Sequence, residues 1–123
     1  MPIEFKRIDH LLISIPVGKV EEAKHFYLEV LGLKQIPKPA NVLKNGGFWA
    51  LIANIELHIG VEAAVGPPSK RHPAFEIEDL EGARGYLKGK GVRIKEYEPL
   101  PNFNRFSFFD PFDNRIELLE KIK

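Results

Sequence analysis

The chain has 123 residues, of which 44% are hydrophobic and 28% are charged. This balance is typical of one globular domain, residues 1–123, with a hydrophobic core. Lys and Arg total 18 against 17 Asp and Glu, which excludes a strong field that would attract nucleic acid or a membrane surface. The expected partners are therefore a small molecule and another copy of the chain.

The sequence contains no cysteine and no long apolar run. The first absence excludes disulfides and any thiolate chemistry supplied by the protein. No run approaches the roughly 20 apolar residues that span a bilayer, and the charged start MPIEFKRIDH is unlike a signal peptide. The expected location is the cytoplasm.

The first half of the chain predicts a strand, a helix and three more strands. Residues 7–16 are typical of a strand, and residues 20–33 carry apolar side chains at three- and four-residue spacing, as an amphipathic helix does. Three short strand-like segments follow, the first two separated by a loop rich in Pro and Asn, at 33–37, 46–53 and 54–61.

The second half repeats this order after the breaker stretch GPPSK at 66–70. A strand is expected at 71–79, a helix at 80–92, and three strands within VRIKEY, RFSFFD and NRIELLEK. The segment 96–104 is rich in Pro and Asn, so we expect it to be irregular and to form a pocket rim.

Corresponding residues of the two halves are separated by nearly constant offsets. The pairs are His10 and His72, Ala23 and Ala83, Gly32 and Gly91, and Glu56 and Glu117, at offsets of 62, 60, 59 and 61 residues. We therefore predict an α+β fold of two β-α-β-β-β modules, about 5–62 and about 70–123. Each module is too small to bury its own sheet face, so the two are expected to pair into a curved mixed sheet with helices outside. The alternative is two unrelated α+β halves.

Each module has a His near its start and a Glu near its end on the sheet face opposite the helix, because strand side chains alternate. These residues are His10, Glu56, His72 and Glu117. If the modules pair by pseudo-symmetry, two imidazoles and two carboxylates converge into a nitrogen and oxygen set that suits divalent Zn, Ni, Co, Mn or Fe. The alternative is that each His is a packing residue and each Glu reaches solvent.

Further polar and aromatic residues are candidates for the pocket. His58 shares a face with Glu56, so either one is the possible ligand on that strand, and His58 otherwise lines the pocket. Trp49 could stack on a planar substrate and Arg105 could hold an anion, although packing or surface roles fit both equally. His25 is expected to be a solvated surface residue.

The segments DHLLISI, FYLEVLGL, RHPAFEIEDLE and FFDPFDNRIELLE resemble the vicinal oxygen chelate superfamily, over nearly the whole chain. This superfamily holds glyoxalase I, bleomycin-resistance proteins and extradiol dioxygenases, and the last hairpin is similar to a glyoxalase-like branch without an assigned reaction. The resemblance implies a homodimer and a metal bound by His10, Glu56, His72 and Glu117, within one chain or across two.

The function that the resemblance implies is a divalent-metal-dependent lyase or isomerase for a small substrate with vicinal oxygens, with Glu117 or Glu56 as the base. Ser14 and Gly60 stand where glyoxalase I has an arginine and an asparagine that hold glutathione, so its hemithioacetal is not the expected substrate. The alternatives are an extradiol-type dioxygenase with two His and one Glu as ligands, and a metal-free ligand-sequestering protein of the bleomycin-resistance type.

Overall fold

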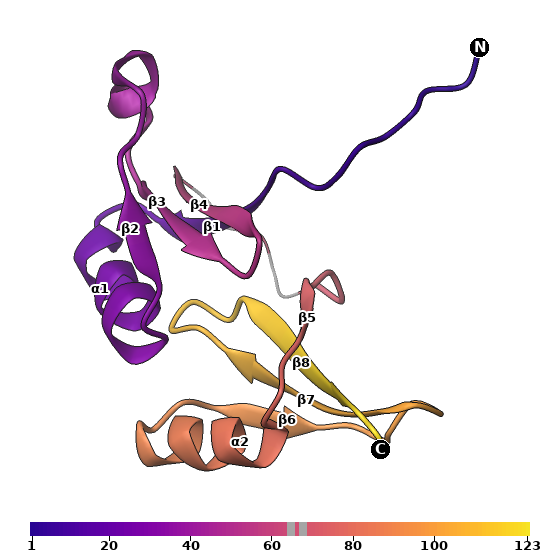
Figure 1. Ribbon diagram of the computed structural model, residues 1–123. Coiled ribbons are helices and arrows are strands. Elements are labelled where there is room, and N and C mark those ends of the chain that lie inside the picture. The colour runs from indigo at the N-terminus through magenta and orange to yellow at the C-terminus, as the bar shows by residue number, and fades with distance from the viewer. Residues whose placement is uncertain (64–65, 67–68) are drawn as a thin grey trace. The chain divides into compact units, whose positions relative to one another are not determined.

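The structure is a computed structural model that describes residues 1–63, 66 and 69–123 (Figure 1). It divides into two compact units, Met1–Val65 and Gly66–Lys123. Two prolines of the expected breaker stretch, at positions 67 and 68, lie outside the described residues.

The first unit contains a four-stranded sheet in the order β1-β4-β3-β2. Its strands β1 and β4 are parallel, and the other neighbours are antiparallel. Its elements are β1 (His10–Pro16), α1 (Val20–Lys24), η1 (His25–Val30), β2 (Lys34–Ile36), η2 (Ala40–Asn45), β3 (Phe48–Ile52) and β4 (Ile55–Glu62).

The second unit repeats this topology, with the order β5-β8-β7-β6 and with β5 and β8 parallel. Its elements are β5 (Ala74–Glu76), α2 (Leu80–Gly89), β6 (Ile94–Glu96), β7 (Phe103–Phe109) and β8 (Arg115–Lys121). The prediction of two β-α-β-β-β modules in an α+β fold is thereby confirmed.

Strand alternation decides which face of each sheet is buried. In β1, Ile13 and Ile15 are buried, whereas Leu12 between them is 63% exposed. Figure 1 shows the helix of each unit lying along one side of its own sheet. The apolar face therefore packs under the helix, and the face that carries His10 is left for other contacts.

The first helix differs from the prediction in two ways: its second part is π-helical, and it ends at Val30. The expected helix 20–33 is α-helical only to Lys24 and is a π-helix over His25–Val30. The Leu31 N–H donates to the Phe26 carbonyl oxygen at 2.9 Å, five residues back, as in a π-helical turn. A wider turn brings neighbouring side chains closer to one face, and Phe26 and Tyr27 are both buried in the core.

Several other boundaries also differ from the sequence prediction. The strand expected at 71–79 is limited to Ala74–Glu76, directly after Pro73, which has no N–H for a sheet ladder. Strand β7 begins at Phe103, inside the segment expected to be irregular. A short 3-10 helix, η2, occupies part of the loop that is rich in Pro and Asn.

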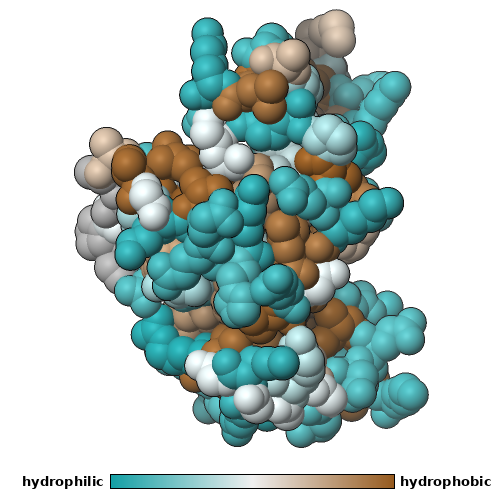
Figure 2. Space-filling view, turned by 90° about the vertical axis from the view of Figure 1, so that its left-hand side faces the viewer, coloured by the Kyte–Doolittle hydropathy of each residue, from teal (hydrophilic) through white to brown (hydrophobic). Residues whose placement is uncertain are grey.

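Large apolar side chains are also exposed among the described residues. On the face that Figure 2 shows, hydrophobic residues lie in small groups between hydrophilic ones. The N-terminal end of the chain extends away from the sheet of its unit (Figure 1), and Met1, Ile3 and Phe5 are exposed. Within the described part of the chain, no helix is long and apolar enough to cross a membrane.

Replacing Ala53 by glycine is expected to stabilise the protein by about 0.5–1 kcal/mol. Ala53 and Asn54 form the two-residue turn between β3 and β4, and Ala53 has a φ of +50°. A left-handed backbone strains a residue with a Cβ by about 1–2 kcal/mol, whereas glycine costs about 0.4–1 kcal/mol through the unfolded chain. The midpoint of urea unfolding measures the change.

The matched control is Asn54→Gly, because Asn54 is not among the residues with a positive φ. This variant is expected to be neutral or destabilising, since it adds chain entropy without relieving strain. An Ala53→Gly midpoint at or below that of the unchanged protein would contradict the strain at Ala53.

Candidate functional site

In the first unit, the parallel pairing of β1 and β4 places His10 directly opposite Glu56. The Glu56 N–H donates to the Asp9 carbonyl oxygen at 3.1 Å and fixes this register. Directly paired strand residues project to the same face, about 5 Å apart at Cβ. The two predicted ligands of this unit are therefore neighbours.

His58 lies in a stack of three rings that crosses this sheet. Its ring stacks on Trp49 with 3.7 Å between centroids, and on His10 with 3.9 Å. His58 Nε2 also lies 2.9 Å from Glu56 Oε1. One face of Trp49 is thus covered by His58, and His58 itself is largely buried and holds the Glu56 carboxylate.

The Nδ1 atom of the His10 ring contacts a neighbouring carboxylate. His10 Nδ1 lies 2.9 Å from Asp9 Oδ2, and Arg7 donates to the other oxygen of Asp9 at 3.0 Å. The hydrogen bond from the His10 ring, with the nearby Arg7 charge, lowers the pKa of the Asp9 carboxyl. An acceptor at Nδ1 leaves Nε2 as the nitrogen with the free lone pair in the neutral ring, as in many metal sites.

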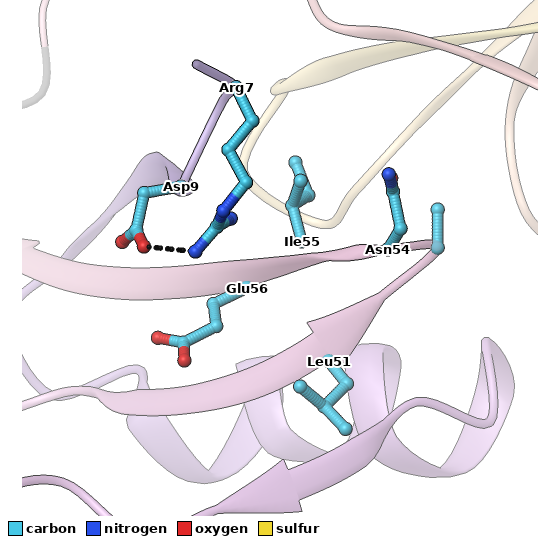
Figure 3. A pocket seen from close by; sticks show the side chains of 7 residues that line it. Arg7, Asp9, Leu51, Asn54, Ile55 and Glu56 are labelled. Carbon is cyan, nitrogen blue, oxygen red and sulfur yellow. Dashed lines mark hydrogen bonds and ion pairs between the residues drawn. The ribbon is translucent and has the colours of Figure 1, made fainter.

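A pocket of about 370 Å³ lies beside this half of the candidate site, at the turn between β3 and β4 (Figure 3). Glu56 lines it together with Arg7 and Asp9, which Figure 3 shows joined by their ion pair. The strained residue Ala53 lies in the same wall. A small polar molecule in this pocket would therefore lie beside Glu56.

In the second unit, His72 and Glu117 form the corresponding pair. His72 Nε2 lies 2.9 Å from Glu117 Oε1, and the side chain of Glu117 is only 5% exposed. His72 Nδ1 lies 2.7 Å from the Lys70 carbonyl oxygen, which can only accept, so Nδ1 carries a proton. Nε2 is thereby directed at Glu117.

Two arginines flank Glu117 on the same face of β7 and β8. Arg105 Nη1 donates to Glu117 Oε2 at 3.5 Å, and Arg115 Nη2 lies 3.7 Å from Oε1. Arg105 is one of the predicted binding residues, but the sequence analysis missed Arg115. Its position two residues before Glu117 in one strand is the signal that could have found it.

The backbone register shows that His10 and His72 are not equivalent. Ala74 lies opposite Glu117, as His10 lies opposite Glu56. His72 precedes β5 by two residues and reaches Glu117 diagonally. The two His residues are separated in sequence by nearly the same offset as the other corresponding pairs. They nevertheless occupy different positions in the strand register relative to their glutamates.

His25 lies on the surface, as predicted. Its side chain is 67% exposed, and Nδ1 lies 2.6 Å from Glu29 one helical turn away. This contact is an exposed pair of the same residue types as the His72 and Glu117 pair, which makes His25 a natural control for experiments on His72.

Among the described residues there is no group of three or more His, Cys, Asp or Glu that could hold a metal ion, but the pair in the second unit has the spacing of two metal ligands. Metal–ligand distances of about 2.1 Å place neighbouring ligand atoms of an octahedral ion about 3 Å apart. The 2.9 Å between His72 Nε2 and Glu117 Oε1 matches this spacing. The oxygen acceptors at the Nδ1 atoms of His10 and His72 are those expected around metal-binding imidazoles.

Two β-α-β-β-β units with this sheet order are the arrangement of the vicinal oxygen chelate class. The profile of the Glyoxalase/Bleomycin resistance protein/Dioxygenase superfamily matches residues 7–118, and the chain belongs to this superfamily.

Solved structures with the same fold agree with this assignment. A glyoxalase family protein from Bacillus anthracis is 38% identical, with a TM-score of 0.92 over 99% of this chain and 100% of that one. A glyoxalase family protein from Enterococcus faecalis is 25% identical, with a TM-score of 0.76 over 94% and 98%. These likenesses establish the family but leave the reaction open.

A more distant structure shares the fold alone. The genomically encoded fosfomycin resistance protein FosX from Listeria monocytogenes is 16% identical, with a TM-score of 0.79 over 97% of this chain and 96% of that one. No protein with curated function matches the chain.

Proposed function

We propose that the protein is a divalent-metal-dependent lyase or isomerase that acts on a small substrate with vicinal oxygens. The proposed ligands are His10, Glu56, His72 and Glu117, and the metal is one of Zn, Ni, Co, Mn or Fe. The two units of one chain, or two chains of a homodimer, supply these ligands. Membership of a superfamily that includes metal-dependent enzymes supports this choice.

The contact between His72 and Glu117 is the observation that carries the proposal. Its 2.9 Å separation has the spacing of adjacent metal ligands, and the Lys70 carbonyl oxygen fixes the ring so that Nε2 faces the carboxylate. A buried carboxylate beside an oriented imidazole is a costly arrangement in a small domain. A functional requirement for both groups would account for this arrangement.

The residues of the chain then have distinct tasks in the reaction. When bound, a divalent metal polarises vicinal oxygens and acidifies the adjacent C–H. Glu117 Oε1 faces His72, and Oε2, which Arg105 contacts at 3.5 Å, is the oxygen proposed to take a proton from substrate carbon and return it. Glu56, held by His58 at 2.9 Å, is the second acid or base on the other half of the site.

The metal content of the full chain, purified without added metal or chelator, tests the proposal. We expect elemental analysis to find close to one transition metal ion per chain. This metal should be lost on treatment with EDTA and should return when Ni, Co, Mn, Zn or Fe(II) is added. The loaded protein is then screened with 2-oxoaldehyde adducts, acyl-CoA epimers and catechols. Turnover of a catechol with uptake of O₂ would replace the isomerase with the extradiol dioxygenase.

Protein that binds none of these metals, before or after reconstitution, would overturn the proposal. That result would favour a metal-free protein that sequesters a ligand, as in bleomycin resistance. A far-UV circular dichroism spectrum that EDTA leaves unchanged serves as the control that metal removal has not simply denatured the chain, whereas the unfolding temperature should fall because bound metal stabilises the folded state.

A further inference from the structure

The two arginines beside Glu117 form a site that the metal ligands do not require. Both guanidinium groups belong to the second unit, and their side chains are only 22% exposed for Arg105 and 16% for Arg115. Ser107 lies directly opposite Glu117 in the pairing of β7 and β8. The arginines, the serine and the carboxylate therefore share one face of one sheet.

Three groups hold the two guanidiniums in place. Arg105 Nε donates to the Glu98 carbonyl oxygen at 2.9 Å, and Arg115 Nε donates to Ser107 Oγ at 3.0 Å. Both guanidinium carbons also lie near the ring of Tyr97, at 5.5 Å for Arg105 and 4.3 Å for Arg115. Side chains ordered in advance lose less entropy when a ligand binds.

The positive charge of this pair exceeds what Glu117 offsets. The contacts from the two terminal nitrogens to the carboxylate, at 3.5 and 3.7 Å, are longer than the 2.7–2.9 Å typical of charge-assisted hydrogen bonds. Two guanidiniums thus share one carboxylate through loose contacts, and their terminal N–H groups retain the capacity to bind a second oxyanion.

We propose that Arg105 and Arg115 clamp an oxyanion group of the substrate, a carboxylate or a phosphoryl group, next to the reacting carbon. The substrate class is then a small acid whose vicinal oxygens lie beside the anionic group. The role of this arginine pair in catalysis rests on the proposed function. Anion binding by the two arginines, however, needs no metal and is tested separately.

A ¹H–¹⁵N NMR titration of EDTA-treated full-length protein with inorganic phosphate, and separately with acetate, tests the clamp. The arginine Nε–H and backbone signals of β7 and β8 are followed at constant ionic strength. We expect saturable shifts at both arginines, and a loss of affinity of about tenfold or more in Arg105→Gln/Arg115→Gln. The preferred anion identifies the substrate group, and preference for either one supports the clamp.

Arg93→Gln is the matched control in the same unit. Arg93 lies over the Phe109 ring at 4.2 Å and pairs with Asp113, but its side chain is 60% exposed. This variant is expected to bind phosphate within about twofold of the unchanged protein. If the double variant does not fold, Arg105→Gln and the charge-retaining Arg105→Lys decide, because the lysine should recover only part of the affinity.

Glu117→Gln separates this proposal from the metal proposal. It removes a metal ligand and also the carboxylate that competes for both guanidiniums, so it is expected to lose metal but bind phosphate more tightly. Equal, unsaturable shifts in the unchanged protein, the double variant and Arg93→Gln would overturn the clamp, whatever the metal content. Metal-free protein with a working clamp would instead overturn only the metal proposal.

Discussion

Replacing His72 by alanine is expected to lower the affinity for the divalent metal by more than about 100-fold. Loss of a partner that merely orients a ligand typically costs 10–100-fold, and in our proposal His72 supplies a ligand atom itself. Its Nε2, 2.9 Å from Glu117 Oε1, has no substitute in an alanine side chain. Competition with a coloured chelator measures the affinity, and elemental analysis measures the retained metal.

His25→Ala is the control for this experiment. His25 has the same side chain and also contacts a glutamate, Glu29, but it is exposed on the first helix. Its replacement should leave the metal affinity unchanged within about twofold, since exposed pairs contribute little. Equal metal retention by both alanine variants would exclude His72 as a ligand.

Replacing Asp110 by alanine is expected to destabilise the protein by about 3 kcal/mol. Asp110 is 3% exposed and follows β7. Its carboxylate accepts from the N–H groups of Phe112 and Asn114 at 2.9 Å, and from the Asn114 side chain at 2.8 Å. Donors left without an acceptor in a buried loop cost about 1–3 kcal/mol each, reduced by water that enters.

Urea unfolding measures this loss, which is a large part of a total stability of about 5–15 kcal/mol. Asp113→Asn is the control in the same loop. Asp113 has a φ of +70°, which asparagine tolerates, and its pair with Arg93 is exposed. We expect a change below about 1 kcal/mol for this variant, and an Asp110→Ala loss as small as that would show that the loop does not depend on the buried carboxylate.

The loop also links stability to the candidate site. It leads from β7 into β8, the strand that carries Arg115 and Glu117. A loosened loop should therefore weaken metal and anion binding together, whereas Arg105→Gln/Arg115→Gln should weaken anion binding alone. This difference distinguishes a general loss of order from a loss of particular ligand contacts.

Much of the fold could be predicted because its determinants are local. Side chains alternate along β1, so Ile13 and Ile15 had to share the buried face and His10 the other one. The repeated order of strands and helix required only hydrophobic period and turn residues. By contrast, the π-helical turn at Phe26 and Tyr27 depends on how two aromatic rings fit the core, which no local pattern records.

The sequence by itself determined the two modules and the residues that face away from their helices, among them His10, Glu56 and Glu117, because the two-residue period of a strand fixes this choice. Only the tertiary structure decided the contacts of those residues. The stack of Trp49 on His58, the arginine pair around Glu117 and the diagonal reach of His72 depend on strand register and side-chain rotamers. Register and rotamers are set by pairing between strands that are distant in sequence. A shift of one strand by two residues along its partner leaves each side chain on the same face of the sheet but changes every residue that it contacts.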